Sequence, residues 1–449
     1  MSTAETSTKA ALADNRAVTS LLISQPLEWR VRAVEELVID SATSCQRRRS
    51  LQVAPLRTLL ADYVTPTHET AILALNVAPM PRGPLMEFDI KGPNGAAWLL
   101  PRPEIARRQA LYLGDLAAAH GRDLSEPVLS LLTTIVGFTG EWFSRNGPMS
   151  LEEYLEEGLG RSITADTVGY WRHIGDECRK ILRPRVDEFR DYSAPENPAL
   201  VIPELFAANI VASDKEASSL LAEYADLLDF LERQAPVDDL PTYADDFLNA
   251  LADYGRNYDL IAAMEVPLDE PFIVKYSERR NLNISLFANT SQQSVFIADA
   301  QSNHVSLKVA DPSVRLRQFS AKNFDLSGYA VGAYQPRQDD QSVAIYAHEA
   351  EREYRVNLQF SLAPLRRLEV VPYLAAAMLT LLTLALLEQQ PNTLRDLAII
   401  AGPAALAASV LLAREPTTLG SRIRLLSSTA LFCALTFLLI SSAYLYLAE

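Results

Sequence analysis

The strongest hydrophobic pattern lies near the C-terminus, where three apolar stretches cover about 370–387, 397–413 and 425–445. None of them contains an Asp, Glu, Lys, Arg or His. A helix of about 20 apolar residues crosses the hydrocarbon core of a bilayer, and roughly 17 residues are the practical minimum. The pattern therefore predicts three transmembrane helices within residues 367–449.

Charged residues that flank the three stretches predict their orientation. Arg395 lies between the first and second stretches, and five arginines share the opposite side of the membrane: Arg366, Arg367, Arg414, Arg422 and Arg424. Basic residues are enriched in cytoplasmic loops. We therefore expect a multi-pass protein of the cell (plasma) membrane, with these five side chains at the cytoplasmic interface. Residues 1–367 would then be cytoplasmic and the C-terminus outside.

Small residues recur at helical spacing in the second stretch, at Ala401, Ala405 and Ser409. Such rows let helices approach closely in lipid. They predict packing within the three-helix bundle, with self-association of the chain as the alternative. Because the stretches lack ionisable groups, we expect no proton relay or ion path through them.

Upstream of the membrane region, residues 23–102 show the pattern of β-strands. Apolar and polar residues alternate over 86–91, and an Asn94-Gly95 turn, a strong hairpin signal, follows. Earlier strands are expected over 31–39, 50–56 and 71–77. We expect residues 1–22 to form a disordered N-terminus.

Residues 103–265 change to helical signals. Ser150 and Glu153, like Ser213 and Glu216, have the spacing of a capping box that opens a helix. The apolar segment 127–138 is too short to cross a membrane, so it predicts a buried core helix. Leucines and a tyrosine recur every three or four positions over 220–231, which favours a helix facing the protein's own core.

The period of two returns in residues 266–366 and is clearest over 354–362. Several short strands separated by turn signals are typical of a β-sandwich. The expected fold is therefore an α+β soluble region, with β-sandwich-like strands and a helical block, followed by three transmembrane helices. We prefer one composite sandwich that includes strands from 23–102, and two separate β modules are the alternative.

Composition narrows the classes of partner. The formal net charge of −15 disfavours nucleic-acid binding, which depends on neutralising phosphates. The chain has three cysteines, Cys45, Cys178 and Cys433, which do not make a disulfide framework and fit a reducing compartment. The expected partners are membrane lipid and either another protein or further copies of the chain.

Known catalytic motifs are missing from the sequence, including the P-loop, the G-x-S-x-G elbow and the H-E-x-x-H zinc motif. His173 and Glu177 are four residues apart on an expected helix and are the candidate metal ligands. A metal site needs three or four ligands, so a solvated helix face is the alternative that we favour. We expect no catalytic residue and no cofactor.

Two basic clusters remain, one at residues 47–49 and one at residues 179–185. Either has the chemistry to hold a phosphate or an acidic partner segment. The structural alternatives, protection of a strand edge and complementation of a helix dipole, are favoured for both.

Three segments carry a resemblance to a known family. They are the Arg-rich segment CQRRRSLQV at 45–53, FDIKGPNGAAW at 88–98 and IVKYSE at 273–278, with three spans closing the chain. In this order they resemble uncharacterised multi-pass membrane proteins of high-GC Gram-positive bacteria. The resemblance implies a β-rich and helical cytoplasmic region on three C-terminal spans, and it implies no activity.

These observations favour a membrane-tethered, cytoplasm-facing interaction or regulatory protein. One alternative is a homo-oligomeric membrane effector that acts as a pore or sensor. The other is a membrane-bound enzyme, in which case a hydrolase is the most plausible kind.

Overall fold

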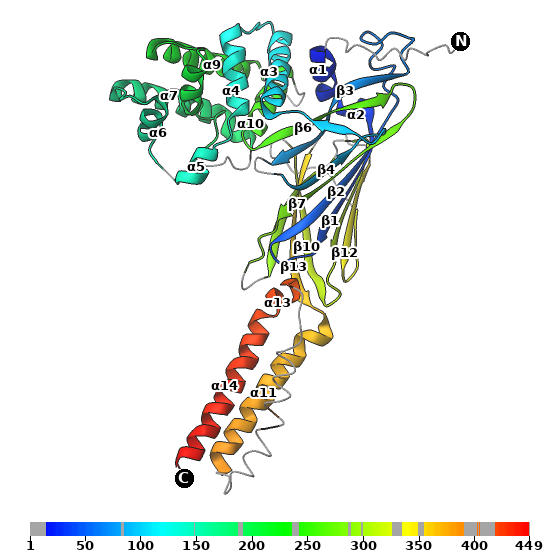
Figure 1. Cartoon of the computed structure of the whole chain (residues 1–449), viewed down its shortest axis with the longest axis vertical. Helices are drawn as coiled ribbons and strands as arrows, with labels where there is room; N and C mark the ends of the chain where they lie inside the picture. Colours follow the sequence, from blue (N-terminus) through cyan, green and yellow to red (C-terminus); the bar gives the residue numbers. More distant parts are fainter. Residues whose placement is uncertain are drawn as a thin grey trace, which may run out of the picture.

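The computed structural model describes residues 15–81, 85–147, 149–186, 192–235, 242–285, 289–297, 300–325, 335–348, 354–389, 402, 404 and 418–448. The fold is a mixed α+β fold with two long apolar helices at the C-terminal end. A helical domain lies beside the upper part of a β body, whose strands run down toward the two C-terminal helices (Figure 1). The molecule is therefore elongated, with the helical domain at the end farthest from those helices.

A seven-stranded sheet forms the centre of the β body, in the order β11-β12-β9-β1-β2-β7-β4. Strand β1 pairs in parallel with β9 and antiparallel with β2, so strands from both ends of the soluble region share one sheet. This shared sheet agrees with the composite arrangement that the sequence pattern favoured over two separate β modules. The strands are β1 (Arg30–Ile39), β2 (Ser44–Val53), β4 (Met86–Lys91), β7 (Phe272–Asn281), β9 (Ser302–Val309), β11 (Gln335–Gln338) and β12 (Ser342–His348).

Two three-stranded sheets cover different parts of one face of this large sheet. The upper sheet has the order β3-β6-β5, and the lower sheet, nearer the C-terminal helices, has the order β10-β13-β8. Each encloses its own apolar core against the large sheet, here called the upper core and the lower core. The strands are β3 (Thr70–Pro81), β5 (Ala97–Leu99), β6 (Asn257–Pro267), β8 (Thr290–Ile297), β10 (Val314–Asp325) and β13 (Tyr354–Pro364).

The helical domain is inserted between β5 and β6 and has one large apolar core. Ser150 and Glu153 form the expected capping box at the start of α6. The leucine stripe over 220–231 is buried on α9, and the apolar segment near 127–138 is the buried helix α4. The helices are α3 (Arg102–Ala119), α4 (Glu126–Gly137), α5 (Glu141–Asn146), α6 (Leu151–Leu159), α7 (Ala165–Leu182), α8 (Ile202–Ala207), α9 (Asp214–Gln234) and α10 (Tyr243–Tyr254), with short 3-10 turns at η1 (Arg183–Arg185) and η2 (Pro198–Val201).

Two expected boundaries are wrong. Residues 257–265, expected in the helical region, belong to β6, which is the central strand of the upper sheet. Four consecutive residues of this strand, 259–262, are buried, so its first half lacks the alternation of a half-exposed strand, and buried and half-buried positions alternate only from 262 onward. Residues 15–22, expected to be disordered, lie in α1 (Asn15–Ser24), where Val18 and Leu22 are buried in the upper core. A short helix α2 (Pro26–Trp29) follows.

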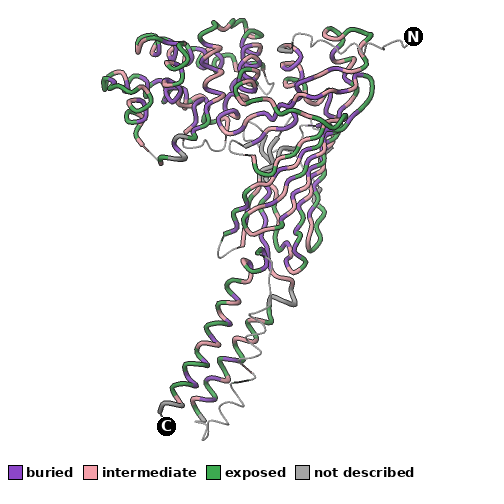
Figure 2. The backbone as a smooth tube through the Cα atoms, viewed as in Figure 1, coloured by how far each residue is buried: buried purple, intermediate pink, exposed green. Residues whose placement is uncertain are grey.

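The C-terminal region contains α11 (Arg366–Gln389), the short α13 (Thr418–Ile423) and α14 (Leu425–Ala448). Two helices among the described residues are long and apolar enough to cross a membrane, over Val370–Glu388 and Leu425–Leu445. They pack against each other through a narrow apolar seam that contains Leu379, Leu386 and Leu438, and most other positions are exposed (Figure 2). The third expected span, 397–413, lies outside the described residues except for Gly402 and Ala404.

Candidate functional site

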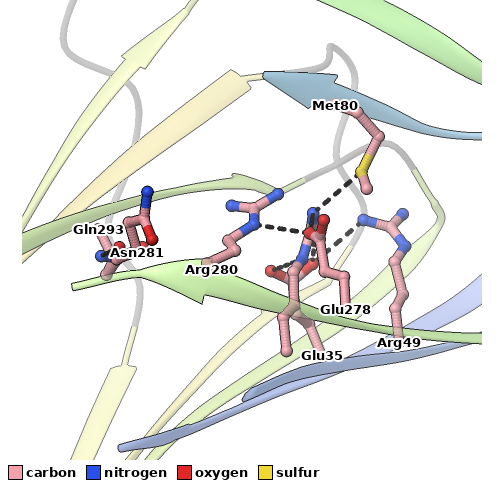
Figure 3. A network of polar contacts seen from close by, with 8 residues as sticks. Glu35, Arg49, Met80, Glu278, Arg280, Asn281 and Gln293 are labelled. Atoms are coloured by element: carbon pink, nitrogen blue, oxygen red, sulfur yellow. Dashed lines mark hydrogen bonds and ion pairs between the residues drawn. The ribbon is translucent and has the colours of Figure 1, made fainter. Parts of the chain in front are cut away.

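A row of charged side chains lies between the upper and lower cores, on the covered face of the seven-stranded sheet. Glu35 on β1, Arg47 and Arg49 on β2, and Glu278 on β7 are all at most 4% exposed. Along β2 the same face carries Cys45 toward the lower core and Leu51 toward the upper core. We call these four residues, with Arg280 of β7, the ionic row (Figure 3).

Arg47 is the centre of the ionic row. Its Nε donates to Glu35 Oε1 and its Nη2 donates to Glu35 Oε2, each at 2.8 Å, so the pair is bidentate. Its Nη1 donates to Glu278 Oε1 at 3.1 Å and contacts the sulfur of Met80 at 3.5 Å. One guanidinium group therefore links β1, β2 and β7 of the large sheet to the end of β3 in the upper sheet.

The remaining members of the ionic row extend this network. Arg49 Nη1 donates to Glu35 Oε2 at 3.3 Å, and Arg280 Nε donates to Glu278 Oε1 at 2.6 Å. Gln293 of β8 donates to the backbone oxygen of Asn281 at 3.1 Å, which ties the lower sheet to the end of β7. The ionic row thus contacts the upper sheet through Met80, and the adjoining bond between Gln293 and Asn281 connects the large sheet to the lower sheet (Figure 3).

Electrostatics keep the ionic row charged. Burial opposes ionisation of Glu35, but the guanidinium groups of Arg47 and Arg49 outweigh burial and hold the pKa of Glu35 below its ordinary value. Burial also opposes the charge on Arg47, and Glu35 and Glu278 outweigh it and raise the pKa of that guanidinium. Tyr276 lies beside Arg47 with its ring 5.4 Å from the guanidinium carbon, and burial raises the pKa of its hydroxyl to about 12.

The chemistry of the ionic row is structural. A bidentate arginine pair has strict geometry, and a slip of one residue turns every side chain of a strand to the opposite face. Such a slip in β2 would remove Arg47 from Glu35 and would bury the exposed Arg48. The ionic row therefore specifies the register of β1, β2 and β7.

A second set of specific contacts lies where the β body meets the C-terminal helices. A single residue, Leu365, separates the end of β13 from the start of α11. Helix α13 places Leu419, which is 0% exposed, and Ile423, which is 5% exposed, in the lower core. Arg422 donates to the backbone oxygen of Ile284, and Asn289 donates to that of Ile423, each at 3.4 Å. The segment that precedes α14 therefore completes the apolar core of the β body.

The expected membrane-interface arginines lie partly within the described residues. Arg422 is on α13 and Arg424 follows it, at the base of the β body. Arg366 and Arg367 begin α11, although their side chains lie outside the described parts. Arg414 and the small-residue row of Ala401, Ala405 and Ser409 are also outside the described residues.

The candidate metal ligands His173 and Glu177 lie on the exposed side of α7. Glu177 accepts a hydrogen bond from Lys180 Nζ at 2.7 Å, and this contact lowers the pKa of the carboxyl. Among the described residues, no group of three or more His, Cys, Asp or Glu side chains is placed to hold a metal ion. Glu177 is thus paired with a lysine, and the described part of the chain places no third ligand beside His173 and Glu177.

The second basic cluster, at residues 179–185, is used within the helical domain. Arg179 Nε donates to Glu196 at 2.8 Å. Arg185 donates to Glu232 at 2.7 Å and to Asp245 at 2.9 Å. Arg179 therefore joins α7 to the segment that precedes η2, and Arg185 joins η1 to α9 and α10, so both arginines stabilise the packing of the domain.

The first basic cluster differs from its expected place. Residues 47–49 were expected to adjoin a strand beginning at 50, and they lie in the middle of β2, which begins at Ser44. Consecutive strand residues point to opposite faces, so Arg47 and Arg49 are buried and Arg48 is exposed. A signal was present in the sequence, because Arg47 and Arg49 continue the alternation of Leu51 and Val53.

Comparisons of the chain with models of known protein families, with curated proteins and with solved structures found no match. The resemblance to multi-pass membrane proteins of high-GC Gram-positive bacteria stays a prediction.

Proposed function

We propose that this chain is a membrane-tethered, cytoplasm-facing interaction or regulatory protein, whose soluble body binds a protein partner at a fixed position relative to the cell membrane. The observation that carries this proposal is the insertion of Leu419 and Ile423 into the lower core. An ordinary tether needs a linker, whereas here the membrane region and the body share an apolar core.

The geometry of α11 and α14 supports three spans. Both helices begin at the base of the β body and run away from it side by side (Figure 1). Gln389 at the end of α11 and Thr418 at the start of α13 consequently lie at opposite ends of the pair. The chain between them has to return over the length of α11, about 36 Å at 1.5 Å per residue. The apolar stretch 397–413 supplies a suitable crossing segment.

The proposed orientation follows from the same geometry. Helix α11 and the stretch 397–413 would make two crossings before α14 begins, so Arg422 and Arg424 would lie on the side of the membrane that also holds the β body. Together with Arg366, Arg367 and Arg414 they make this side the basic one, which is the cytoplasmic side in most membrane proteins.

The structure also supports mechanical coupling between membrane and body. Displacement of α14 would pull α13, and α13 cannot leave the lower core without exposing Leu419 and Ile423. Exposing two large aliphatic side chains costs about 3–6 kcal/mol. A change in the packing of the spans is therefore transmitted to the lower sheet, which suits a regulatory role.

The proposal is tested by purifying the N-terminally tagged chain from membranes in mild detergent and measuring its native mass. We expect a second protein in stoichiometric amount that is absent from a mock purification of untagged membranes. A strictly monomeric chain with no partner would overturn the proposal. A defined homo-oligomer without a second protein would also overturn it and would favour a pore or sensor.

A further inference from the structure

The face of the seven-stranded sheet that points away from the upper and lower cores has a distinct composition among the described residues. On β7, β2, β1, β9 and β12 the residues that point away from the two cores form one surface, here called the outer face. Cross-strand register places Lys275, Ser50, Val34, His304 and Tyr346 in one row across these five strands. The outer face is thus one surface formed by five neighbouring strands of the same sheet.

The charge of the outer face is opposite to that of the whole chain. It carries five basic residues and one acidic residue, whereas the chain has a formal net charge of −15. Glu36 is shared between Arg48 and Lys308, and Arg279 pairs with Asp40 and Glu87 at the rim. The summed formal charge of the outer face stays positive when the carboxylates of Asp40 and Glu87 are included. Its charged members are Arg32, Glu36, Arg48, Lys275, Arg279 and Lys308.

Exposed apolar side chains lie among these charges. Val34 is 39% exposed, Tyr346 is 43% exposed and Ile273 is 48% exposed. The ring of His304 lies 4.4 Å from that of Tyr346, and Arg32 Nη2 donates to His304 Nε2 at 3.2 Å. Tyrosine and arginine side chains around an apolar centre are typical of protein interfaces.

We propose that the outer face docks an acidic segment of a partner protein, with carboxylates at Arg32 and Lys275 and an apolar side chain on Val34 and Tyr346. This inference rests on the proposed function, because it names the surface and the chemistry of the partner.

Charge and orientation favour this occupant over others. Two copies of the outer face would place basic residues against basic residues, and like charges in an interface cost several kcal/mol. Lipid headgroups do not fit this face. Its strands run toward the C-terminal helices, so the outer face would be roughly perpendicular to the membrane surface (Figure 1). An acidic protein segment satisfies both constraints.

A fluorescein-labelled peptide of repeated Glu-Glu-Leu is the probe, and its affinity for the full chain in nanodiscs is measured by anisotropy. The test variant is Arg32→Glu with Lys275→Glu. The matched control is Arg172→Glu with Lys215→Glu, which reverses two exposed basic residues on the helical domain. A second variant, Val34→Ser with Tyr346→Ser, removes the apolar centre and leaves the charges unchanged.

We expect binding that weakens with salt, falls about tenfold or more in the test variant and the second variant, and is unchanged in the control. No binding to the original chain, or equal losses in test and control variants, would overturn the inference. The tagged purification separates the two proposals. A partner retained by Arg32→Glu with Lys275→Glu leaves the proposed function standing and overturns the docking face. If the original chain binds phosphatidylserine vesicles and the Arg32→Glu with Lys275→Glu variant does not, the outer face binds lipid. That result would also overturn the inference.

Discussion

Replacing Arg47 with Met tests whether the ionic row holds the large sheet together. The change keeps a long side chain at the position and removes the bidentate bonds to Glu35 and the bond to Glu278. Breaking a buried ion pair from one side costs about 3–5 kcal/mol, because it leaves a buried charge without its partner. The matched control is Arg48→Met on the same strand. Arg48 is 57% exposed and its ion pair with Glu36 is 3.8 Å long, so its loss costs about 0–1 kcal/mol.

Amide hydrogen exchange of the full chain in detergent measures this difference strand by strand. A loss of 3–5 kcal/mol corresponds to about 10²- to 10⁴-fold lower protection, since each 1.4 kcal/mol is tenfold. We expect this loss in β1, β2 and β7 of the Arg47→Met variant. Protection in α9 of the helical domain should not change, because that helix belongs to a separate core.

The effect of Arg47→Met should also depend on pH. In the original chain the pKa of Glu35 is lowered, so its stabilising contribution is present above the unfolded pKa and is lost as pH falls through the folded pKa. In the variant, Arg47 no longer offsets the effect of burial on Glu35, so the pKa of Glu35 rises. The stability of the variant then falls as pH rises through that higher pKa. The destabilisation of the variant relative to the original chain should therefore be smaller at pH 5 than at pH 8.

The double variant Glu35→Gln with Arg47→Met removes the isolated carboxylate and should recover part of the loss. Equal protection in the Arg47→Met and Arg48→Met variants would refute the reasoning. A destabilisation that does not change with pH would refute the assignment of the cost to Glu35.

Three further predictions concern single residues. Asp259 accepts hydrogen bonds from Gln109 and Tyr254, each at 3.0 Å, and burial raises its pKa. Ionisation of Asp259 therefore lowers the stability of the fold as pH rises above the unfolded pKa. The Asp259→Asn variant should have a melting temperature that depends less on pH. Tyr276→Phe removes a buried hydroxyl that has no hydrogen-bond partner among the described residues, so urea unfolding should show unchanged or higher stability, by about 1 kcal/mol. Glu177→Ala should change stability by at most about 0.5 kcal/mol and leave the zinc content of the purified chain, measured by mass spectrometry, unchanged.

Sequence periodicity predicts elements well where one face is buried and the other is exposed. Strand β1 runs over Arg30–Ile39 against an expected 31–39, and β13 over Tyr354–Pro364 against 354–362. Helix α4 and the stripe of α9 are buried as their spacing indicates. In each case local alternation of apolar and polar residues carries the information.

Periodicity fails where burial or pairing depends on distant residues. Strand β6 has four consecutive buried residues at 259–262 and alternates only in its second half. The parallel pairing of β1 with β9 joins residues far apart in the chain, and local patterns do not encode it. The buried Arg47 looks like a surface cation until Glu35 and Glu278 are placed beside it. Leu419 and Ile423 lie in a segment too short to stand out beside the apolar stretches.

The proposed coupling depends on α13, at the start of the C-terminal helices, completing the lower core of the β body. The most direct test is hydrogen exchange of the full chain in detergent with Leu419→Ala and Ile423→Ala, compared with Leu425→Ala, which truncates a side chain that is 44% exposed. Each buried truncation costs about 2–5 kcal/mol, so protection should fall by at least about tenfold in β10 and β13 and stay constant in α9 and in the control. Unchanged protection in β10 and β13 would contradict the claim, because the lower core would then be complete without α13.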